Sequence, residues 1–359
     1  MDETITEHSQ LRRGWTTGAC AAAAAKAAFA ALVTGEFLDP VTIRLPRGHE
    51  PAFALAETAS GDGWARAGVI KDAGDDPDVT HGALIQATVR RGSPGSGVVF
   101  KAGEGVGTVT KPGLPLAVGE PAINPVPRQI IRDGVADVAG TLGTTGDVVV
   151  EISVPGGAEI ALQTWNPRLG IVGGLSILGT SGIVVPYSCA AWIASIHRGV
   201  DVARAGNVRH VAAATGRTSE EAVQRLYGLE PSALLDMGDF AGGLLKYMRR
   251  HPLPRLTIAG GFAKLSKLAQ GYLDLHSGRS QVDLDWLAQE LRALGGTPPD
   301  DPRSAGAFLA AAQTQGIALA DRIGALARTT ALTTLDGAPV AVDVLVMDRA
   351  GNVAGRGGD

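Results

Sequence analysis

Carboxylates cluster between Lys71 and Gly82, where five charged residues and His81 occupy twelve positions between two predicted strands. Clustered carboxylate oxygens are the ligands that a hard cation requires, so these aspartates and His81 could in principle bind one. The calcium-loop pattern, with carboxylates at alternate positions and a closing Glu, is absent. Aspartates also tie turns, which is the competing structural interpretation. The aspartates are Asp72, Asp75, Asp76 and Asp78.

A glycine-rich segment from Asn166 to Pro186 is the second candidate. Its glycines lie among apolar residues, where glycine is costly unless the backbone needs left-handed angles or a close approach. The pattern predicts a buried strand over 169–172 followed by a glycine turn, which is where open α/β sheets bind nucleotide-like ligands. The spacing is not G-x-G-x-x-G, so the dinucleotide fingerprint is absent. A tight structural turn packed against a helix is the alternative.

Basic residues near glycine-rich turns could meet an anionic ligand in the first half of the chain. The loop from Gly103 to Thr110 offers consecutive backbone amides that could cradle a carboxylate or phosphate, with Lys101 and Lys111 at its edges. A hairpin turn explains the same glycines. Arg128 and Arg168 are candidate forks for a carboxylate, although most arginines only solvate a surface.

A second basic group follows a predicted strand at 256–259. Lys264 could meet an anion at a helix start, where the helix dipole also favours negative charge. A single histidine such as His276 is more often a hydrogen-bonded structural residue than a catalytic one. No Ser-His-Asp order, P-loop or metalloprotease motif is present, which removes the commonest hydrolase and kinase interpretations.

Composition indicates a folded protein without a global basic surface. The 359 residues are 45% hydrophobic and 19% charged, and the net charge is -4. We therefore expect neither nucleic acid nor a membrane surface as a partner. The two cysteines, Cys20 and Cys189, lie far apart and have no second ligand at metal-type spacing, so we expect a reduced, cytoplasmic protein without a zinc site.

The chain is long enough for two domains. Residues 1–160 are predicted to form an α+β domain of several strands, an Ala-rich helix from Ala19 to Val33 and the Asp-rich loop. The Ala-rich helix contains Lys26 and is too short to span a bilayer, so we interpret it as a soluble helix. Residues 161–359 alternate strands, at 208–213, 256–259 and 341–347, with helices such as 305–327, which predicts a parallel, doubly wound domain.

Taken together, several motifs resemble those of the cobalt-precorrin-5B C-1-methyltransferases of the anaerobic cobalamin pathway. They occur in the family's order and spread over most of the chain. A few positions depart from the family pattern: Trp15 replaces Tyr, Cys189 and Ala190 follow Ser188 where two acids are usual, Gly261 replaces a frequent His, and Asp239 stands near a frequent Asn. The motifs are Gly14–Gly18, Lys71–Asp78 with Thr80–Gly82, Gly103–Thr110, Ala122–Asn124 with Pro127–Arg128, Asn166–Pro186, Lys264–Leu265, Lys267–Ala269, Gly271 and His276–Ser277.

This resemblance implies an α+β first domain followed by an α/β Rossmann-like second domain, three-layered with a mainly parallel sheet. It implies methyl transfer from S-adenosylmethionine to C-1 of a cobalt-containing tetrapyrrole, and it is compatible with a homo-oligomer. Asp72, Asp75 and His81 would be catalytic, hydrogen bonding ribose or macrocycle, with His81 a proton acceptor and no metal bound. The expected cofactor-binding residues are Gly173, Gly174, Ser176, Gly179, Thr180, Ser181 and Gly182. The expected substrate-binding residues are Lys101, Arg128, Arg168, Lys264 and His276.

Two other function classes remain open at this point. A non-catalytic tetrapyrrole carrier would keep the basic anchors but would not bind S-adenosylmethionine. A metal-dependent hydrolase or phosphotransferase would use the Asp72–His81 loop and would bind divalent ions.

Overall fold

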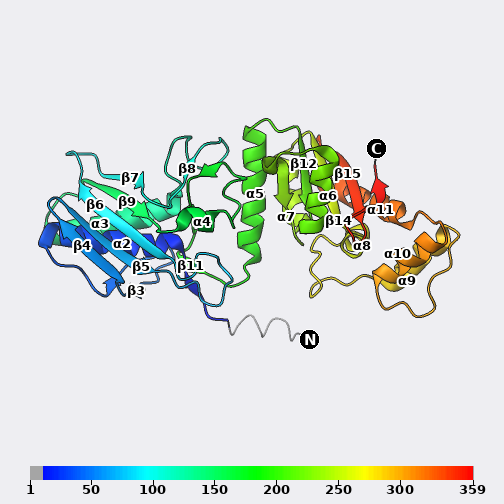
Figure 1. Cartoon of the computed structure of the whole chain (residues 1–359), viewed down its shortest axis with the longest axis horizontal. Helices are drawn as coiled ribbons and strands as arrows, with labels where there is room; N and C mark the ends of the chain where they lie inside the picture. Colours follow the sequence, from blue (N-terminus) through cyan, green and yellow to red (C-terminus); the bar gives the residue numbers. More distant parts are fainter. Residues whose placement is uncertain (1–10, 359) are drawn as a thin grey trace. The chain divides into compact units, whose positions relative to one another are not determined.

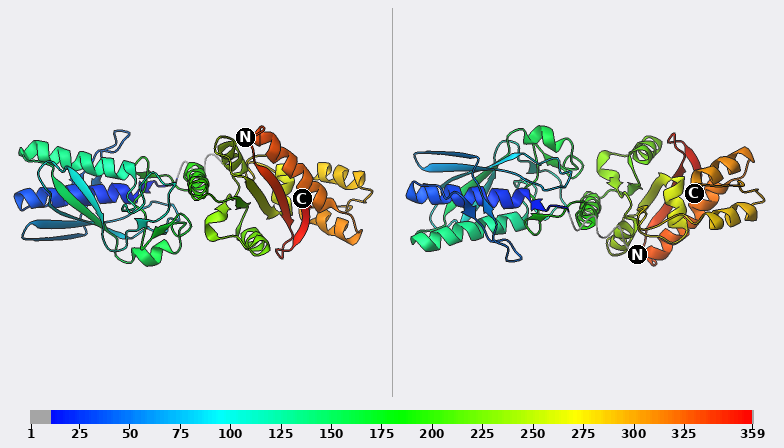
Figure 2. Two further views of the ribbon diagram at one scale, coloured as in Figure 1. Left: turned by 90° about the horizontal axis from the view of Figure 1, so that it is seen from above. Right: turned by 90° about the horizontal axis from the view of Figure 1, so that it is seen from below.

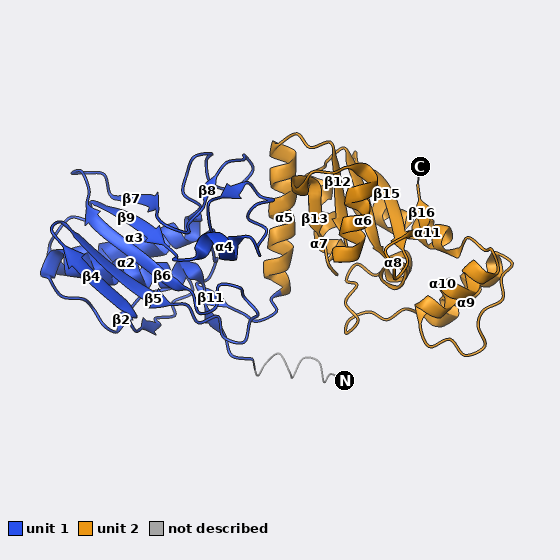
Figure 3. Cartoon of the chain, viewed as in Figure 1, with its two compact units in different colours: residues 1–188 blue, residues 189–359 orange. Residues whose placement is uncertain are grey.

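The computed structural model describes residues 11–358, and the chain divides into two compact units (Figures 1 and 3). Unit 1 comprises Met1–Ser188 and unit 2 comprises Cys189–Asp359. The division therefore comes later than the predicted boundary at residue 160, and the glycine-rich segment 166–186 is part of unit 1.

Unit 1 contains a five-stranded sheet in the order β4-β5-β6-β9-β7. Neighbouring strands are antiparallel except for β7, which pairs with β9 in parallel. Alternation sets the buried face, because Val148, Val150 and Ile152 of β9 are buried while their neighbours are half-buried. The strands are β4 (Glu57–Gly61), β5 (Trp64–Ile70), β6 (Leu84–Arg91), β7 (Val98–Ala102) and β9 (Val148–Ser153).

Helix α2 (Thr17–Thr34) is the centre of the unit 1 core and confirms the Ala-rich helix expected from the sequence. Thr16 Oγ1 caps it by accepting from Ala19 N at 3.2 Å, and Gly35, with a φ of 85°, ends it. It packs against β5, β6 and helix α3 (Pro125–Leu142), which runs beside it in both views of Figure 2. It is the one helix among residues 11–358 long and apolar enough to cross a membrane, but 78% of it is buried inside unit 1.

Short strand pairs attach the glycine-rich segment to unit 1. Strand β10 (Ile171–Val172) is antiparallel to β8 (Thr108–Val109), and β11 (Ile183–Val184) is antiparallel to β1 (Gly14–Trp15). These pairings explain why the unit boundary follows the segment instead of preceding it. The remaining elements within residues 11–188 are β2 (Val41–Thr42), β3 (Ala52–Phe53) and α4 (Gly157–Ala161).

Unit 2 contains a five-stranded sheet in the order β13-β12-β14-β15-β16. The first four strands are parallel, as the alternation of strands and helices predicted, and β16 is antiparallel to β15. The strands are β12 (His210–Ala214), β13 (Leu234–Asp236), β14 (Arg255–Gly261), β15 (Ala341–Met347) and β16 (Val353–Gly357).

Helices cover both faces of this sheet. On one face α6 (Arg217–Tyr227) packs over Ala212, while the other face, marked by Val211 and Ala213, supports the larger core. That core contains α5 (Cys189–Ala205), α7 (Ala241–Arg250), α8 (Phe262–Ala269), α9 (Leu284–Ala293), α10 (Ala305–Thr314) and α11 (Leu319–Leu335). A 3-10 turn, Pro231–Ala233, precedes β13.

The helix predicted over 305–327 is two helices, α10 and α11. Gly316, with a φ of 68°, lies in the turn between them. This left-handed conformation suits glycine and ends the first helix.

A buried polar network lies in the amino-terminal halves of the parallel strands of unit 2. Asp343 accepts hydrogen bonds from Thr257 Oγ1 at 2.8 Å, Tyr227 OH at 3.0 Å and Arg255 Nε at 3.1 Å. The Thr257 hydroxyl is 2.8 Å from His210 Nε2. Since that hydroxyl donates to Asp343, it accepts from His210, which places the histidine proton on Nε2. Burial and the nearby Arg255 hold the pKa of His210 below its ordinary value.

Candidate functional site

The Asp-rich loop lies between β5 and β6, and Arg12 organises it. Asp72 pairs with both terminal nitrogens of the Arg12 guanidinium and also accepts from Gly74 N at 2.9 Å. Asp75 Oδ2 accepts from Arg12 N at 2.6 Å. The hydrogen bond from Arg12 is the main reason why the pKa of Asp72 falls to about 2, so this carboxylate is ionised and a weak base at neutral pH.

His81 joins the same loop. Its Nδ1 accepts a hydrogen bond from Ala73 N at 3.1 Å and lies 3.9 Å from Asp72 Oδ1. The structure therefore brings the three predicted catalytic residues, Asp72, Asp75 and His81, into one turn. Because Nδ1 is an acceptor, neutral His81 carries its proton on Nε2, and the side chain is half exposed.

The other two aspartates of the loop, Asp78 and Asp76, bond to residues of unit 1. Asp78 Oδ2 is 2.5 Å from Nζ of Lys71, a lysine that is only 1% exposed, and Thr80 donates to Oδ1. Burial opposes ionisation of Asp78, but Lys71 and Thr80 outweigh it and leave the pKa of Asp78 below its ordinary value. Asp76 Oδ1 accepts from Tyr187 N at 2.8 Å. Among residues 11–358, no group of three or more His, Cys, Asp or Glu residues could hold a metal ion.

The two glycine-rich segments of unit 1 pack backbone against backbone. A Cβ on Gly174 would lie 2.2 Å from the carbonyl oxygen of Gly105, and one on Gly105 would lie 1.9 Å from that of Val154. Gly107 N donates to Leu175 O at 2.8 Å, and Leu175 N donates to Gly105 O at 2.8 Å. Close approach within unit 1 thus accounts for glycine at 105 and 174. Gly173, with a φ of 88°, has open space around it.

The remaining expected cofactor residues lie along the same segment. Ser176 Oγ donates to Asn166 Oδ1 at 3.2 Å, and Ser181 Oγ donates to Ile183 O at 3.1 Å. A Cβ on Gly179 or Gly182 would meet the side chain of Thr16 or Leu45 respectively. Thr180 is exposed.

The five expected substrate residues fall on both units. Lys101 is exposed on β7 and Arg168 is half-buried, both in unit 1. The Arg128 guanidinium is committed within unit 1, where it donates to Ile123 O at 2.7 Å, to Pro121 O at 3.1 Å and to Glu120 Oε2 at 2.8 Å. Lys264 and His276 belong to unit 2, and His276 is exposed, its Nδ1 accepting from Gly278 N at 3.1 Å.

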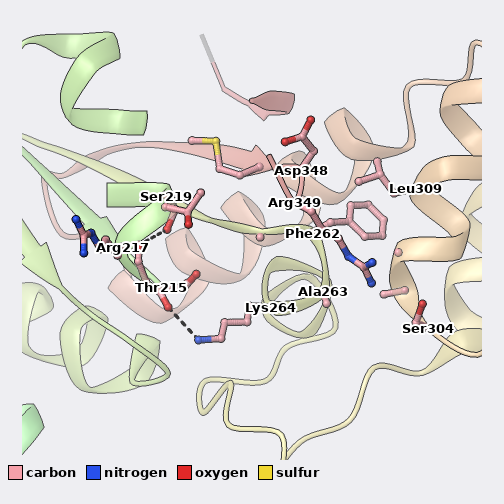
Figure 4. Close-up of a pocket in the computed structure, with 16 residues that line it drawn as sticks. Thr215, Arg217, Ser219, Phe262, Ala263, Lys264, Ser304, Leu309, Asp348 and Arg349 are labelled. Atoms are coloured by element: carbon pink, nitrogen blue, oxygen red, sulfur yellow. Dashed lines mark hydrogen bonds between the residues drawn. The ribbon is translucent and has the colours of Figure 1, made fainter. Parts of the chain in front are cut away.

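Unit 2 has a pocket of about 420 Å³ at the carboxyl edge of its sheet (Figure 4). The turn after β12 contributes Thr215–Ser219, and the end of β14 with the start of α8 contributes Gly261–Lys264. The start of α10 contributes Ser304–Gly306, and the end of β15 contributes Met347–Arg349. The starts of α6, α8 and α10 therefore meet at this pocket, and none of them has a side-chain capping hydrogen bond.

The cationic side chains of the pocket differ in their partners. Lys264 Nζ donates to Thr215 O at 2.9 Å and also lies 2.9 Å from the buried Asp239 Oδ1, an approach not aligned for a hydrogen bond. Arg217 Nε is 2.8 Å from Glu221 Oε1. Arg349 is exposed and has no ion-pair partner within the described range 11–358.

Among the residues that line this pocket, the sequence pattern singled out Lys264 but not Gly216 or Arg349. A signal for Gly216 existed, because it follows a predicted strand at the point where open α/β sheets bind ligands. No local pattern distinguishes Arg349 from other surface arginines, and only the fold brings it to the start of α10, where Nη2 would be 3.6 Å from a Cβ on Gly306.

A pocket at the carboxyl edge of a mainly parallel sheet, beside several helix starts, is the usual ligand site of an α/β enzyme. The particular family follows from sequence comparison. The chain belongs to the CbiD family, whose family model matches residues 4–186.

Curated relatives match the whole chain. The cobalt-precorrin-5B C(1)-methyltransferase of Paramagnetospirillum magneticum is 60% identical over 354 residues, which cover 98% of this chain and 99% of the relative. That of Rhodospirillum rubrum is 62% identical over 363 aligned residues and covers 100% of both chains. The crystal structure of a cobalamin biosynthesis protein (CbiD) from Archaeoglobus fulgidus is 26% identical, covers 86% of this chain and 85% of that chain, and has a TM-score of 0.41.

Proposed function

We propose that this protein is a cobalt-precorrin-5B C(1)-methyltransferase that takes its methyl group from S-adenosylmethionine and gives cobalt-precorrin-6A. The observation that carries the proposal is the identity of about 60% over full length to relatives of that name, which leaves no region of the chain unmatched. A metal-dependent hydrolase built on the Asp-rich loop receives no comparable support, because each of its aspartates accepts bonds from a named protein partner.

The proposed reaction is an in-line displacement at the methyl carbon. The conjugated macrocycle supplies the electron pair of the new bond at C-1, and the electron pair of the broken carbon–sulfur bond stays on sulfur, which leaves S-adenosylhomocysteine. The positive charge of the sulfonium passes to the macrocycle. Such a step depends on orientation more than on a strong base, and good orientation can supply roughly 7–11 kcal/mol of rate enhancement. A site without a catalytic triad is therefore compatible with it.

The site residues and the finer fold description are part of this proposal. We propose that unit 2 is the three-layer, Rossmann-like domain, on the basis of its parallel strands and the helices on both faces. In unit 1, His81, Lys101, Gly173 and Thr180 are expected contacts with an exposed side chain or backbone that a reactant could reach. Arg128 is less suited as an anchor for a substrate carboxylate, because its donors already have three acceptors.

The direct test uses S-adenosylmethionine with a deuterated methyl group. Incubation of the protein with cobalt-precorrin-5B should add one labelled methyl to the tetrapyrrole in mass spectrometry, and NMR should place it at C-1. Recovery of unlabelled tetrapyrrole, from protein that binds it, would instead indicate a carrier.

The role of the Asp-rich loop needs its own variants. We expect His81→Ala to slow methylation, while Arg44→Ala, which removes an exposed ion pair of unit 1 with Glu50, keeps the wild-type rate. Methylation by folded His81→Ala at the wild-type rate would leave the loop with a structural role only.

A further inference from the structure

The pocket of unit 2 lies where the chain changes direction across the sheet. From β12 the chain passes to β13 on one side, and then crosses to β14 on the other side of β12. The carboxyl ends of β12 and β14 thus bound a crevice that no connection covers, the point at which open α/β sheets hold ligands. Thr215, just after β12, and Gly261, at the end of β14, both line the pocket.

Glycine at position 216 has no explanation within the protein itself. Its φ of 165° is extended backbone that any residue adopts, and a Cβ there would have no atom within 4 Å. It is the residue before the first turn of α6, where Ser, Thr, Asp or Asn would cap the free amides of the helix. Gly216 leaves those amides open toward the pocket, as does Gly261 at the start of α8, also with open space around it.

The charges around the pocket favour an anionic group. Arg349 has no ion-pair partner among residues 11–358, and the Lys264 ammonium lies at the start of α8. Helix starts carry partial positive charge, and uncapped amides are donors for a carboxylate. The one carboxylate in the lining, Asp348, is held by its own turn, because it accepts from Ala350 N, Asn352 N and Asn352 Nδ2.

The size of the pocket favours the smaller of the two reactants that carry a carboxylate. A pocket of about 420 Å³ is in the lower part of the range of roughly 300–1,000 Å³ that holds drug-sized ligands, and a tetrapyrrole with acid arms is far larger than S-adenosylmethionine. Resting on the proposed function, we propose that this pocket binds the carboxylate end of the methyl donor, with Arg349 and the open amides of α6 as its contacts. A carboxylate arm of the tetrapyrrole is the rival source of the same chemistry.

Calorimetric titrations of the full chain with two nucleosides test whether the pocket binds the methyl donor or the tetrapyrrole. S-adenosylhomocysteine carries the aminocarboxylate end, and 5′-methylthioadenosine lacks it. Wild-type protein should bind S-adenosylhomocysteine at least about tenfold more tightly, the effect of one charged hydrogen bond. Arg349→Ala and Gly216→Ser should reduce this preference, and neither should change binding of 5′-methylthioadenosine by a comparable factor.

The variants have matched controls. Arg209→Ala removes another exposed arginine of unit 2, just before the amino-terminal end of β12, and should leave the preference unchanged. Gly216→Ser adds a capping side chain, so its thermal unfolding temperature should stay the same or rise while binding weakens. Loss of affinity together with loss of stability would indicate a structural role for Gly216 and would overturn its part in the site.

Failure of this inference and failure of the proposed function give different experimental results. If S-adenosylhomocysteine binds all variants like wild type while affinity for the tetrapyrrole falls in Arg349→Ala, the pocket belongs to the substrate and the inference is wrong. Equal binding of both nucleosides by wild type also overturns it. If wild-type protein binds neither S-adenosylmethionine nor S-adenosylhomocysteine, with or without the tetrapyrrole, the proposed donor itself fails.

Discussion

Unit 1 and unit 2 differ in how they use residues that could do chemistry. In unit 1, most candidate groups already have partners: Asp72 and Asp75 hold Arg12, Asp78 holds Lys71, and Gly174 packs on Gly105. In unit 2, fewer motifs are visible in the sequence, yet three helix starts without a side-chain cap line a pocket, together with an arginine that has no ion-pair partner among residues 11–358. A high density of polar and glycine residues can therefore reflect bonding within the protein as well as function. A polar group without a partner in the protein is the better indicator of a ligand site.

The largest expected effect contrasts two neighbouring glycines of unit 1. Gly174→Ala should destabilise unit 1 by about 3 kcal/mol or more, because its Cβ would overlap the backbone of Gly105 at 2.2 Å. Gly173→Ala should cost only about 1–2 kcal/mol, the strain of a left-handed alanine. Urea unfolding followed by hydrogen exchange of unit 1 peptides measures both. Equal losses would show that close packing is not what requires glycine here.

A somewhat smaller effect is expected at the buried ion pair of unit 1. Lys71→Met should lower the free energy of unfolding by about 3 kcal/mol, because it leaves Asp78 without its cation. The double variant Lys71→Met with Asp78→Asn should recover part of this loss in the same urea experiment. If the double variant is as unstable as the sum of the singles, the two residues do not act as a pair.

The smallest effect is a difference in acid sensitivity between the units. The pKa of His210 is lowered in the fold, so its contribution to stability is present above about pH 6.5 and is lost as pH falls below it. The pKa of Asp72 is about 2 in the fold, so its contribution is lost only below about pH 4. Unit 2 should thus weaken first on acidification, in hydrogen exchange corrected for intrinsic rates. His210→Gln, which keeps an N–H donor for Thr257, should make the stability of unit 2 less dependent on pH. If the pH dependence of the variant equals that of wild type, titratable groups other than His210 cause it.

Local patterns predicted the elements that depend on local chemistry. Alanine preference and the Thr16 cap located α2, and the alternation of apolar strands with helices located β12, β14 and β15 of unit 2, while the short parallel strand β13 was not predicted. The break between α10 and α11 was missed because a single glycine within an Ala-rich pattern does not by itself end a helix.

Long-range pairing is what the sequence did not reveal. The segment 166–186 looked like the opening of the second domain, but β10 and β11 pair with β8 and β1, which lie far earlier in the chain. The same limit applies to the site. Arg12 reaches Asp72 across the sequence, and Arg349 reaches the pocket only after β15 has joined the sheet.

The central position of α2 has a consequence for synthesis of the chain. Helix α2 ends at Thr34, but the strand β6 that covers one of its sides ends at Arg91, and α3 ends at Leu142. A growing chain therefore presents a long apolar helix well before its covering layers leave the ribosome, at synthesis rates of about 5–20 residues per second. Small alanine side chains limit the area of apolar surface that is exposed during this interval. The composition that permits close packing in the folded protein therefore also lowers the tendency of the growing chain to aggregate.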